Sequence, residues 1–104
     1  MTDFRIEALA QIMTREPDDR AAHYMLGNEY FKAQKYSEAV EILRRYLQSG
    51  DDEESAYRLL AKSHERLGRI EEARQAYREG IAAAEQHGHR PMVEKYTQAL
   101  TDLE

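Results

Sequence analysis

The sequence LGNEYFKAQKYSEAVEIL, at residues 26–43, returns in altered form as LAKSHERLGRIEEARQAY at residues 60–77. Leu26 matches Leu60 and Ala39 matches Ala73, each 34 residues further along the chain. A fixed period of this size indicates stacked supersecondary units, none of which can bury its apolar face alone. The period therefore predicts a repeat architecture, although it does not name a ligand.

Hydrophobic periodicity and turn residues predict about six helices. Gly50, Gly68 and Gly88 each follow an apolar-periodic stretch, where a residue in the left-handed conformation ends a helix. The pairs Asp18-Asp19 and Asp51-Asp52 precede predicted helices and can cap them. Because the loops are short, neighbouring helices are expected to be antiparallel. The predicted helices cover residues of about 3–15, 19–33, 37–49, 53–67, 70–87 and 91–103.

The composition favours one well-hydrated helical domain. The chain has 104 residues, a net charge of −5, 34% charged residues and no cysteine. A chain without cysteine forms neither disulfides nor thiolate metal sites, and an acidic balance disfavours nucleic-acid binding. The apolar runs are too short to span a membrane, and the first residues lack a signal-peptide pattern. We therefore expect a cytoplasmic protein that binds neither nucleic acid nor membrane.

The repeated residues resemble the tetratricopeptide repeat, whose pattern is W-x2-L-G-x2-Y followed by A-x3-F and a proline. The unit at residues 20–53 contains H-x2-L-G-x2-Y from His23 and A-x3-L from Ala39. The unit at residues 54–87 contains Y-x2-L-A-x2-H from Tyr57 and A-x3-Y from Ala73. The resemblance covers nearly the whole chain.

Flanking segments extend the repeat at both ends. Pro17 lies 34 residues before Asp51, so the first predicted helix is the second half of an earlier unit. The last predicted helix does not continue the 34-residue register, because charged residues stand 34 positions after the packing residues Leu60 and Ala61. We interpret this helix as an amphipathic cap. The resemblance implies an all-α, antiparallel helix-hairpin solenoid, coiled as a right-handed superhelix. It would form a single domain over residues 1–104, comprising the half-repeat 3–17, the repeats 20–53 and 54–87, and the cap 90–104.

Such a resemblance implies a non-enzymatic scaffold that binds a peptide or helix of a partner protein in its concave groove. The groove residues would be those of the first helix of each unit that lie off the packing stripe: Tyr24, Asn28, Phe31, Lys32, Arg58, Lys62, Glu65 and Arg66. Cations near Asn28 can hold a carboxylate, and Tyr24 and Phe31 can pack an apolar side chain. Asn28 and Lys62 stand at plausible carboxylate-clamp positions, but Tyr24 replaces the first lysine of such a clamp. Whether the ligand ends in a carboxylate therefore stays open.

An alternative function is structural. An apolar face formed by Val93, Tyr96, Leu100 and Leu103, or the face of the helix at 3–15, can mediate self-association into a homo-oligomer.

Enzymatic constellations are absent from the sequence, because we find no Ser-His-Asp set, phosphate-binding loop or zinc spacing. His87 and His89 flank Gly88 and can bind a metal together with Glu85. A loop histidine pair of this kind is more often solvated or caps a helix. We therefore expect no catalysis, no metal and no cofactor.

Some residues inside predicted helices are interpreted as packing residues. Gly27 and Gly80 cost about 1 kcal/mol each relative to alanine within a helix. We expect Gly27 to lie opposite Ala39 and to allow two helices to approach closely. His23 and His64 occupy aromatic positions of the repeat, so we expect them to be partly buried.

Overall fold

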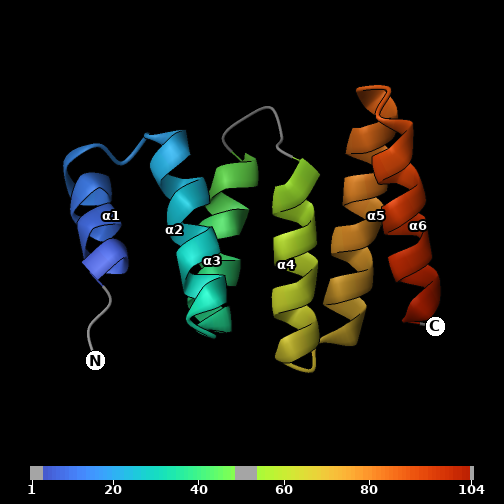
Figure 1. The fold of residues 1–104 in the computed structure, drawn as a ribbon, viewed down its shortest axis with the longest axis horizontal. Coiled ribbons are helices and arrows are strands. Elements are labelled where there is room, and N and C mark those ends of the chain that lie inside the picture. The colour runs from blue at the N-terminus through green and yellow to red at the C-terminus, as the bar shows by residue number, and fades with distance from the viewer. Residues whose placement is uncertain (1–3, 49–53, 104) are drawn as a thin grey trace. The chain divides into compact units, whose positions relative to one another are not determined.

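A computed structural model describes residues 4–48 and 54–103 of the chain. These residues form only α-helices and turns (Figure 1). Each helix end that the structure describes lies within one residue of the end predicted from the sequence. The ends expected at residues 3, 49 and 53, and the roles of Gly50, Asp51 and Asp52, lie outside the described residues. The helices are α1 (Phe4–Arg15), α2 (Arg20–Lys32), α3 (Tyr36–Gln48), α4 (Glu54–Arg66), α5 (Ile70–Gln86) and α6 (Arg90–Asp102).

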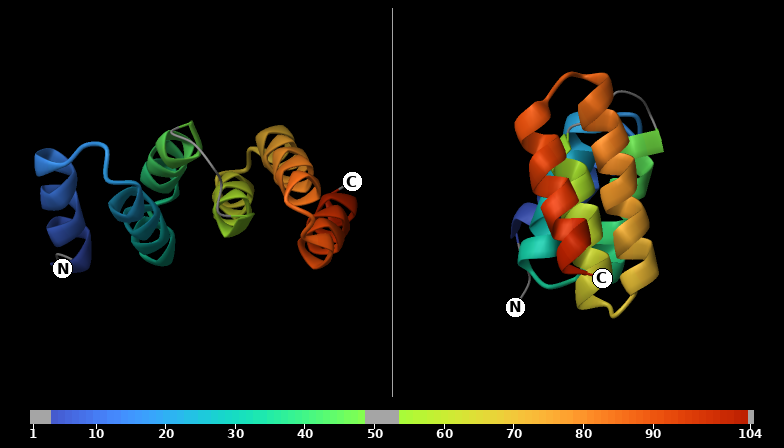
Figure 2. Two further views of the ribbon diagram at one scale, coloured as in Figure 1. Left: turned by 90° about the horizontal axis from the view of Figure 1, so that it is seen from above. Right: turned by 90° about the vertical axis from the view of Figure 1, so that its right-hand side faces the viewer.

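The chain divides into two compact units, Met1–Asp51 and Asp52–Glu104. In the first unit α2 packs against both α1 and α3, and in the second α5 packs against both α4 and α6. Consecutive helices within each unit run in opposite directions (Figures 1 and 2). The structure is therefore all-α and built from antiparallel helix pairs, as predicted. None of its described helices is both long and apolar enough to cross a membrane.

The helix bounds reproduce the sequence period. Helix α4 begins and ends 34 residues after α2, and α5 begins 34 residues after α3. However, α5 has 17 residues whereas α3 has 13, and α6 begins 36 residues after α4. With this offset Val93, Tyr96 and Leu100 of α6 match Tyr57, Leu60 and His64 of α4. The longer α5, partly offset by a shorter connection to α6, accounts for the shifted register of the last helix.

Helices α2, α4 and α5 end in the same way. After each helix an amide donates to a carbonyl five residues earlier over 2.8 Å, in the bonds Lys35 N–Tyr30 O, Arg69 N–His64 O and His89 N–Ala84 O. This pattern places one residue in the left-handed conformation. Gly68 and Gly88 take it with φ of 75° and 70°, as predicted. Gln34, with φ of 62°, takes it after α2 and was not predicted.

The predicted cap of α2 is present. The Oδ1 of Asp19 accepts a hydrogen bond from the Ala22 amide at 3.0 Å, which satisfies a donor of the first turn. Pro91 lies in the first turn of α6, where its missing amide hydrogen costs nothing. These local interactions explain why the helices begin where the sequence indicates.

Both helical glycines allow close packing. A Cβ added to Gly27 would lie 2.7 Å from Leu43 Cδ2, and one added to Gly80 would lie 2.9 Å from Tyr57 Cβ and Tyr96 Cε2. The nearest contact of Gly27 is thus Leu43, one turn beyond the expected Ala39, because a longer side chain reaches into the space that the glycine leaves. In the first unit, Ile6, Leu9 and Leu26 form the buried cluster that joins α1 to α2.

Candidate functional site

The predicted groove residues of the first unit all lie on α2. Tyr24, Asn28 and Phe31 are half-buried and Lys32 is exposed. The Tyr24 ring lies 5.5 Å from the Tyr46 ring, between centroids, and the Phe31 ring contacts the Tyr36 ring edge-on at 5.6 Å. Because Tyr36 and Tyr46 belong to α3, both predicted aromatic residues are held in place by the hairpin partner of α2.

A groove between α1 and α2 brings two of these residues together with residues that were not predicted. Its volume is about 340 Å³. We call this site the α1/α2 groove, and it is lined by Arg5, Ala8, Leu9, Tyr24, Met25, Asn28 and Glu29. The Met25 side chain is 53% exposed although it is large and apolar. An apolar groove with a few polar groups is the usual form of a binding site.

Charged side chains lie at the edge of the α1/α2 groove. The Oε1 atom of Glu29 is 3.4 Å from Arg5 Nη1 and 3.3 Å from Lys32 Nζ. Two cations therefore approach one carboxylate, and the three side chains together carry one positive charge. Lys32, a predicted groove residue, takes part in this cluster.

The predicted residues of the second unit all lie on α4. Arg58 and Arg66 are exposed, whereas Lys62 and Glu65 are half-buried. Lys62 Nζ is 3.9 Å from Glu65 Oε2, and the same oxygen accepts a hydrogen bond from the Tyr77 hydroxyl at 2.7 Å. Glu65 is therefore hydrogen-bonded to α5, although its side chain is still half-exposed.

This contact changes the acidity of a buried phenol. Burial raises the pKa of Tyr77 well above its ordinary value of 10.0, and the hydrogen bond and the negative charge of Glu65 raise it further. The positive charge of Arg58 acts in the opposite direction. The α2 residues belong to the first unit and the α4 residues to the second, so their union in one concave groove stays a prediction.

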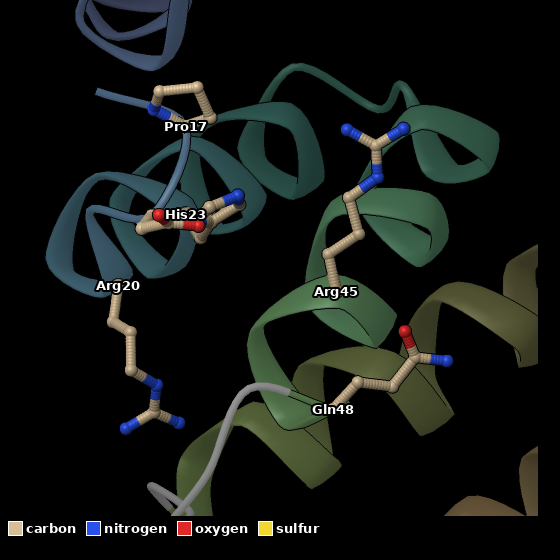
Figure 3. A pocket seen from close by; sticks show the side chains of 6 residues that line it. Pro17, Arg20, His23, Arg45 and Gln48 are labelled. Atoms are coloured by element: carbon tan, nitrogen blue, oxygen red, sulfur yellow. The ribbon is translucent and has the colours of Figure 1, made fainter.

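A second pocket lies where α2 begins and α3 ends. It has a volume of about 490 Å³ and is lined by Pro17, Asp18, Arg20, His23, Arg45 and Gln48. Arg20 lies over the Tyr46 ring at 4.3 Å and donates to the Tyr46 carbonyl at 3.0 Å, while Arg45 pairs with Glu41 at 3.5 Å. Figure 3 shows the two guanidinium groups pointing in different directions. Because the two cations do not converge, this pocket is a weak candidate for an anion site.

The histidines occupy two kinds of environment. His23 and His64 were predicted to be partly buried packing residues, and both are buried. The Nδ1 atom of His23 lies 2.8 Å from the Asp19 carbonyl oxygen. His87 and His89 are exposed, with ring centroids 6.3 Å apart. Across residues 4–48 and 54–103, no three His, Cys, Asp or Glu side chains gather in a metal-binding arrangement.

The face expected to mediate self-association is partly internal. Tyr96 is 1% exposed, and its ring centroid lies 6.0 Å from that of Tyr77. Val93, Leu100 and Leu103 are half-buried on α6, which packs against α5. Tyr96 is therefore a core residue of the second unit, and its ring does not form part of an exposed interface.

Antiparallel hairpins that begin 34 residues apart and approach closely at small residues define a protein of the tetratricopeptide-repeat class. The family model described as "Anaphase-promoting complex, cyclosome, subunit 3" matches residues 4–80, and the chain belongs to this family of repeat proteins. A curated relative, TPR repeat-containing protein PA0015 of Pseudomonas aeruginosa, is 28% identical over 99 residues. The alignment covers 95% of this chain and 94% of that relative.

Solved structures show the same fold. The solution structure of protein BPP2914 from Bordetella parapertussis has a TM-score of 0.81 and 26% identity, covering 99% of this chain and 89% of that chain. A crystal structure of MamA has a TM-score of 0.71 and 22% identity, covering 94% of this chain and 66% of that chain. The likeness to MamA concerns the fold alone.

Sequence reasoning missed the contributions of Arg5, Met25 and Glu29 to the α1/α2 groove. Arg5 lies on the half-repeat helix, which the sequence indicated as part of the repeat and as a possible self-association face, but not as part of the ligand groove. Met25 and Glu29 each follow a predicted groove residue directly on α2. The available signal was a methionine directly after Tyr24, but a methionine on a helix is more often part of a core.

Proposed function

We propose that this chain is a non-enzymatic interaction module that binds a peptide or helix of a partner protein. The observation that carries the proposal is the α1/α2 groove, in which Tyr24 and Asn28 line one wall with apolar Met25 beside them. Membership of the tetratricopeptide-repeat family supports a protein ligand, because such domains generally mediate protein–protein interactions. The net charge of −5 argues against nucleic acid as an alternative ligand.

The predicted groove residues of the second unit include cations on α4. Arg58 and Arg66 are exposed, and Lys62 is half-buried beside Glu65. We propose that they attract a partner segment that carries carboxylates, as Lys32 would in the first unit, because complementary charges favour encounter and register. We also propose that the protein acts in the cytoplasm, which cell fractionation with an antibody to the full chain tests.

Binding to a native partner tests the groove assignment. The tagged full chain is used to purify partners from native cells, in parallel with Arg58→Glu, Lys62→Glu and the control Arg78→Glu. Arg78 is exposed on α5 and lies outside the predicted groove, so its reversal changes the net charge equally. We expect a partner that the wild type and Arg78→Glu retain and that the α4 variants lose. Full retention by Arg58→Glu and Lys62→Glu would show that the assignment of these α4 residues to the groove is wrong.

A further inference from the structure

Large exposed apolar side chains gather at one edge of the first unit. Phe4 is 86% exposed and Ile12 is 39% exposed, and both lie on α1 four residues from Ala8. Residues spaced four apart lie in one row on a helix. Ala8 and Met25 line the α1/α2 groove, so this row extends its apolar wall in both directions. An exposed apolar patch of this kind indicates an interaction surface.

The repeat period shows which kind of element covers the positions of α3 and α5 that are equivalent to Ile12. Ile12 matches Tyr46 of α3 and Gly80 of α5, at intervals of 34 residues. Tyr46 contacts Tyr24 on the preceding helix α2, and Gly80 approaches Tyr57 on the preceding helix α4. In both hairpins a helix therefore covers this position, whereas Ile12 is exposed in the described structure. The surface around Ile12 thus has the form that accepts a helix.

Arg5 determines which charge a helix docked on α1 should carry. It matches Ala39 and Ala73 in the repeat period, and these alanines are fully buried. A helix docked on α1 in the same way would cover Arg5, whose side chain is 76% exposed. Glu29 already pairs with Arg5 but is shared with Lys32, and covering a cluster that keeps an unmatched charge is unfavourable. Because Arg5, Lys32 and Glu29 together carry one positive charge, the charge complement of this site is a carboxylate on the docked helix.

We propose that the α1/α2 groove, with the Phe4–Ala8–Ile12 row, binds an amphipathic helix of a partner protein whose carboxylate pairs with Arg5. Apolar residues of that helix cover Ile12 and Met25. The inference rests on the proposed function and names the chemical class of its ligand. A second copy docked through the same surface fits less well as the occupant, because it would bring together two clusters of Arg5, Lys32 and Glu29 that each carry one positive charge.

A designed peptide tests the ligand class directly. The probe is an alanine-based helical peptide of about 18 residues, a length at which an isolated helix can form. It carries leucines spaced four and three apart and one glutamate in line with them. Matched peptides replace the glutamate by glutamine or by lysine. Titration into the full-length protein is followed by fluorescence anisotropy, and circular dichroism confirms that each protein variant is folded.

Three protein variants complete the design. We expect Arg5→Glu and Ile12→Glu to bind the glutamate peptide at least about tenfold more weakly than the wild type, because one loses the charge pair and the other the apolar contact. Gln11→Glu, exposed on the same helix beside Ile12, should bind as the wild type does. The lysine peptide should restore binding to Arg5→Glu. Wild-type affinity in both Arg5→Glu and Ile12→Glu would overturn the inference.

The native partner separates this inference from the proposed function. If the partner is lost by the α4 variants but retained by Arg5→Glu and Ile12→Glu, the inference fails and the proposed function stands. If all four variants retain it, the inference and the assignment of the α4 residues to the groove both fail, and if the wild type itself retains no partner, the proposed function fails. Light scattering provides a last check: a wild-type dimer that Ile12→Glu converts to a monomer would make a second copy the occupant and overturn the inference.

Discussion

Gly80 is the residue at which three helices of the second unit converge. A Cβ at this position of α5 would lie 2.9 Å from Tyr57 Cβ on α4 and 2.9 Å from Tyr96 Cε2 on α6. Neither a Cβ atom nor a buried ring can move away easily. We expect Gly80→Ala to lower the free energy of unfolding by up to about 2 kcal/mol, because overpacking costs about 1–3 kcal/mol and alanine regains about 1 kcal/mol of helix propensity. Urea unfolding followed by circular dichroism measures the change.

The matched control is Ala82→Gly on the exposed side of the same helix. It isolates the propensity difference between the two residues, for which we expect a loss of about 1 kcal/mol. If Gly80→Ala were instead more stable than the wild type, the close approach of the three helices would be contradicted.

Tyr77 links the fold to a predicted groove residue through its hydrogen bond to Glu65. Its pKa is raised in the folded state, first by burial and then by Glu65. The stabilisation that goes with this raised pKa is complete below pH 10.0, the ordinary value, and is lost as the pH rises towards the folded pKa. We expect Tyr77→Phe to lower the free energy of unfolding by about 1–2 kcal/mol at neutral pH. The difference from the wild type should shrink above pH 10.0.

Urea unfolding at several pH values between neutrality and the alkaline range measures this difference. Tyr36→Phe serves as the control, because it removes a half-buried phenol from the other unit. A difference between Tyr77→Phe and the wild type that stays constant up to the highest pH would show that Tyr77 does not carry this dependence.

The candidate site was predictable only where a residue acts within its own helix. Tyr24 and Asn28 follow from the spacing of the packing stripe on α2, and both line the α1/α2 groove. Arg5 joins that groove through packing between helices, which the spacing within one helix does not encode. Glu65 was predicted as a groove residue, but its contact with Tyr77 spans 12 residues and depends on how α5 lies against α4.

The C-terminal ends of α2 and α4 share one backbone conformation but differ in the residue that adopts it, so exchanging the residue types tests its cost. Both ends contain the same hydrogen-bond pattern, with Gln34 and Gly68 in the left-handed conformation. That conformation costs a residue with a Cβ about 1–2 kcal/mol, and the greater freedom of glycine in the unfolded chain returns about 0.4–1 kcal/mol. We therefore expect Gln34→Gly to stabilise the protein by about 0.5–1 kcal/mol, measured by urea unfolding.

The reverse substitution, Gly68→Gln, should destabilise the protein by a similar amount, because a Cβ at this position would meet no atom within 4 Å and only backbone strain is added. Opposite signs for the two variants are the expected result. A loss of stability in both would mean that the Gln34 side chain contributes more than its backbone strain costs.

Helix boundaries were largely predictable because capping residues and glycines mark them locally. Asp19, Gly68 and Gly88 all act as the sequence indicated. Gln34 escaped prediction because a non-glycine residue with positive φ is uncommon. The shifted register of α6, in contrast, was predictable, because charged residues follow Leu60 and Ala61 by one period.

For the molecule as a whole, the division into two units follows the repeat. The boundary between Met1–Asp51 and Asp52–Glu104 lies within two residues of the predicted boundary between the repeats 20–53 and 54–87. In repeat proteins, stability is approximately a sum of repeat stabilities and nearest-neighbour terms. Leu26 and Leu60 are buried at equivalent positions, 34 residues apart, one in each unit. They therefore form a matched pair of probes for how far a local loss of packing spreads.

We expect Leu60→Ala, in the full chain, to reduce the hydrogen-exchange protection of amides in α4–α6 more than in α1–α3. Leu26→Ala should show the reverse pattern. Each change removes a buried leucine, for which the usual cost is about 2–5 kcal/mol; in a repeat protein that cost falls mainly on the unit that contains the leucine. Residue-resolved exchange measured by NMR distinguishes the outcomes. An equal loss of protection in all six helices would instead mean that the two units unfold as one cooperative structure.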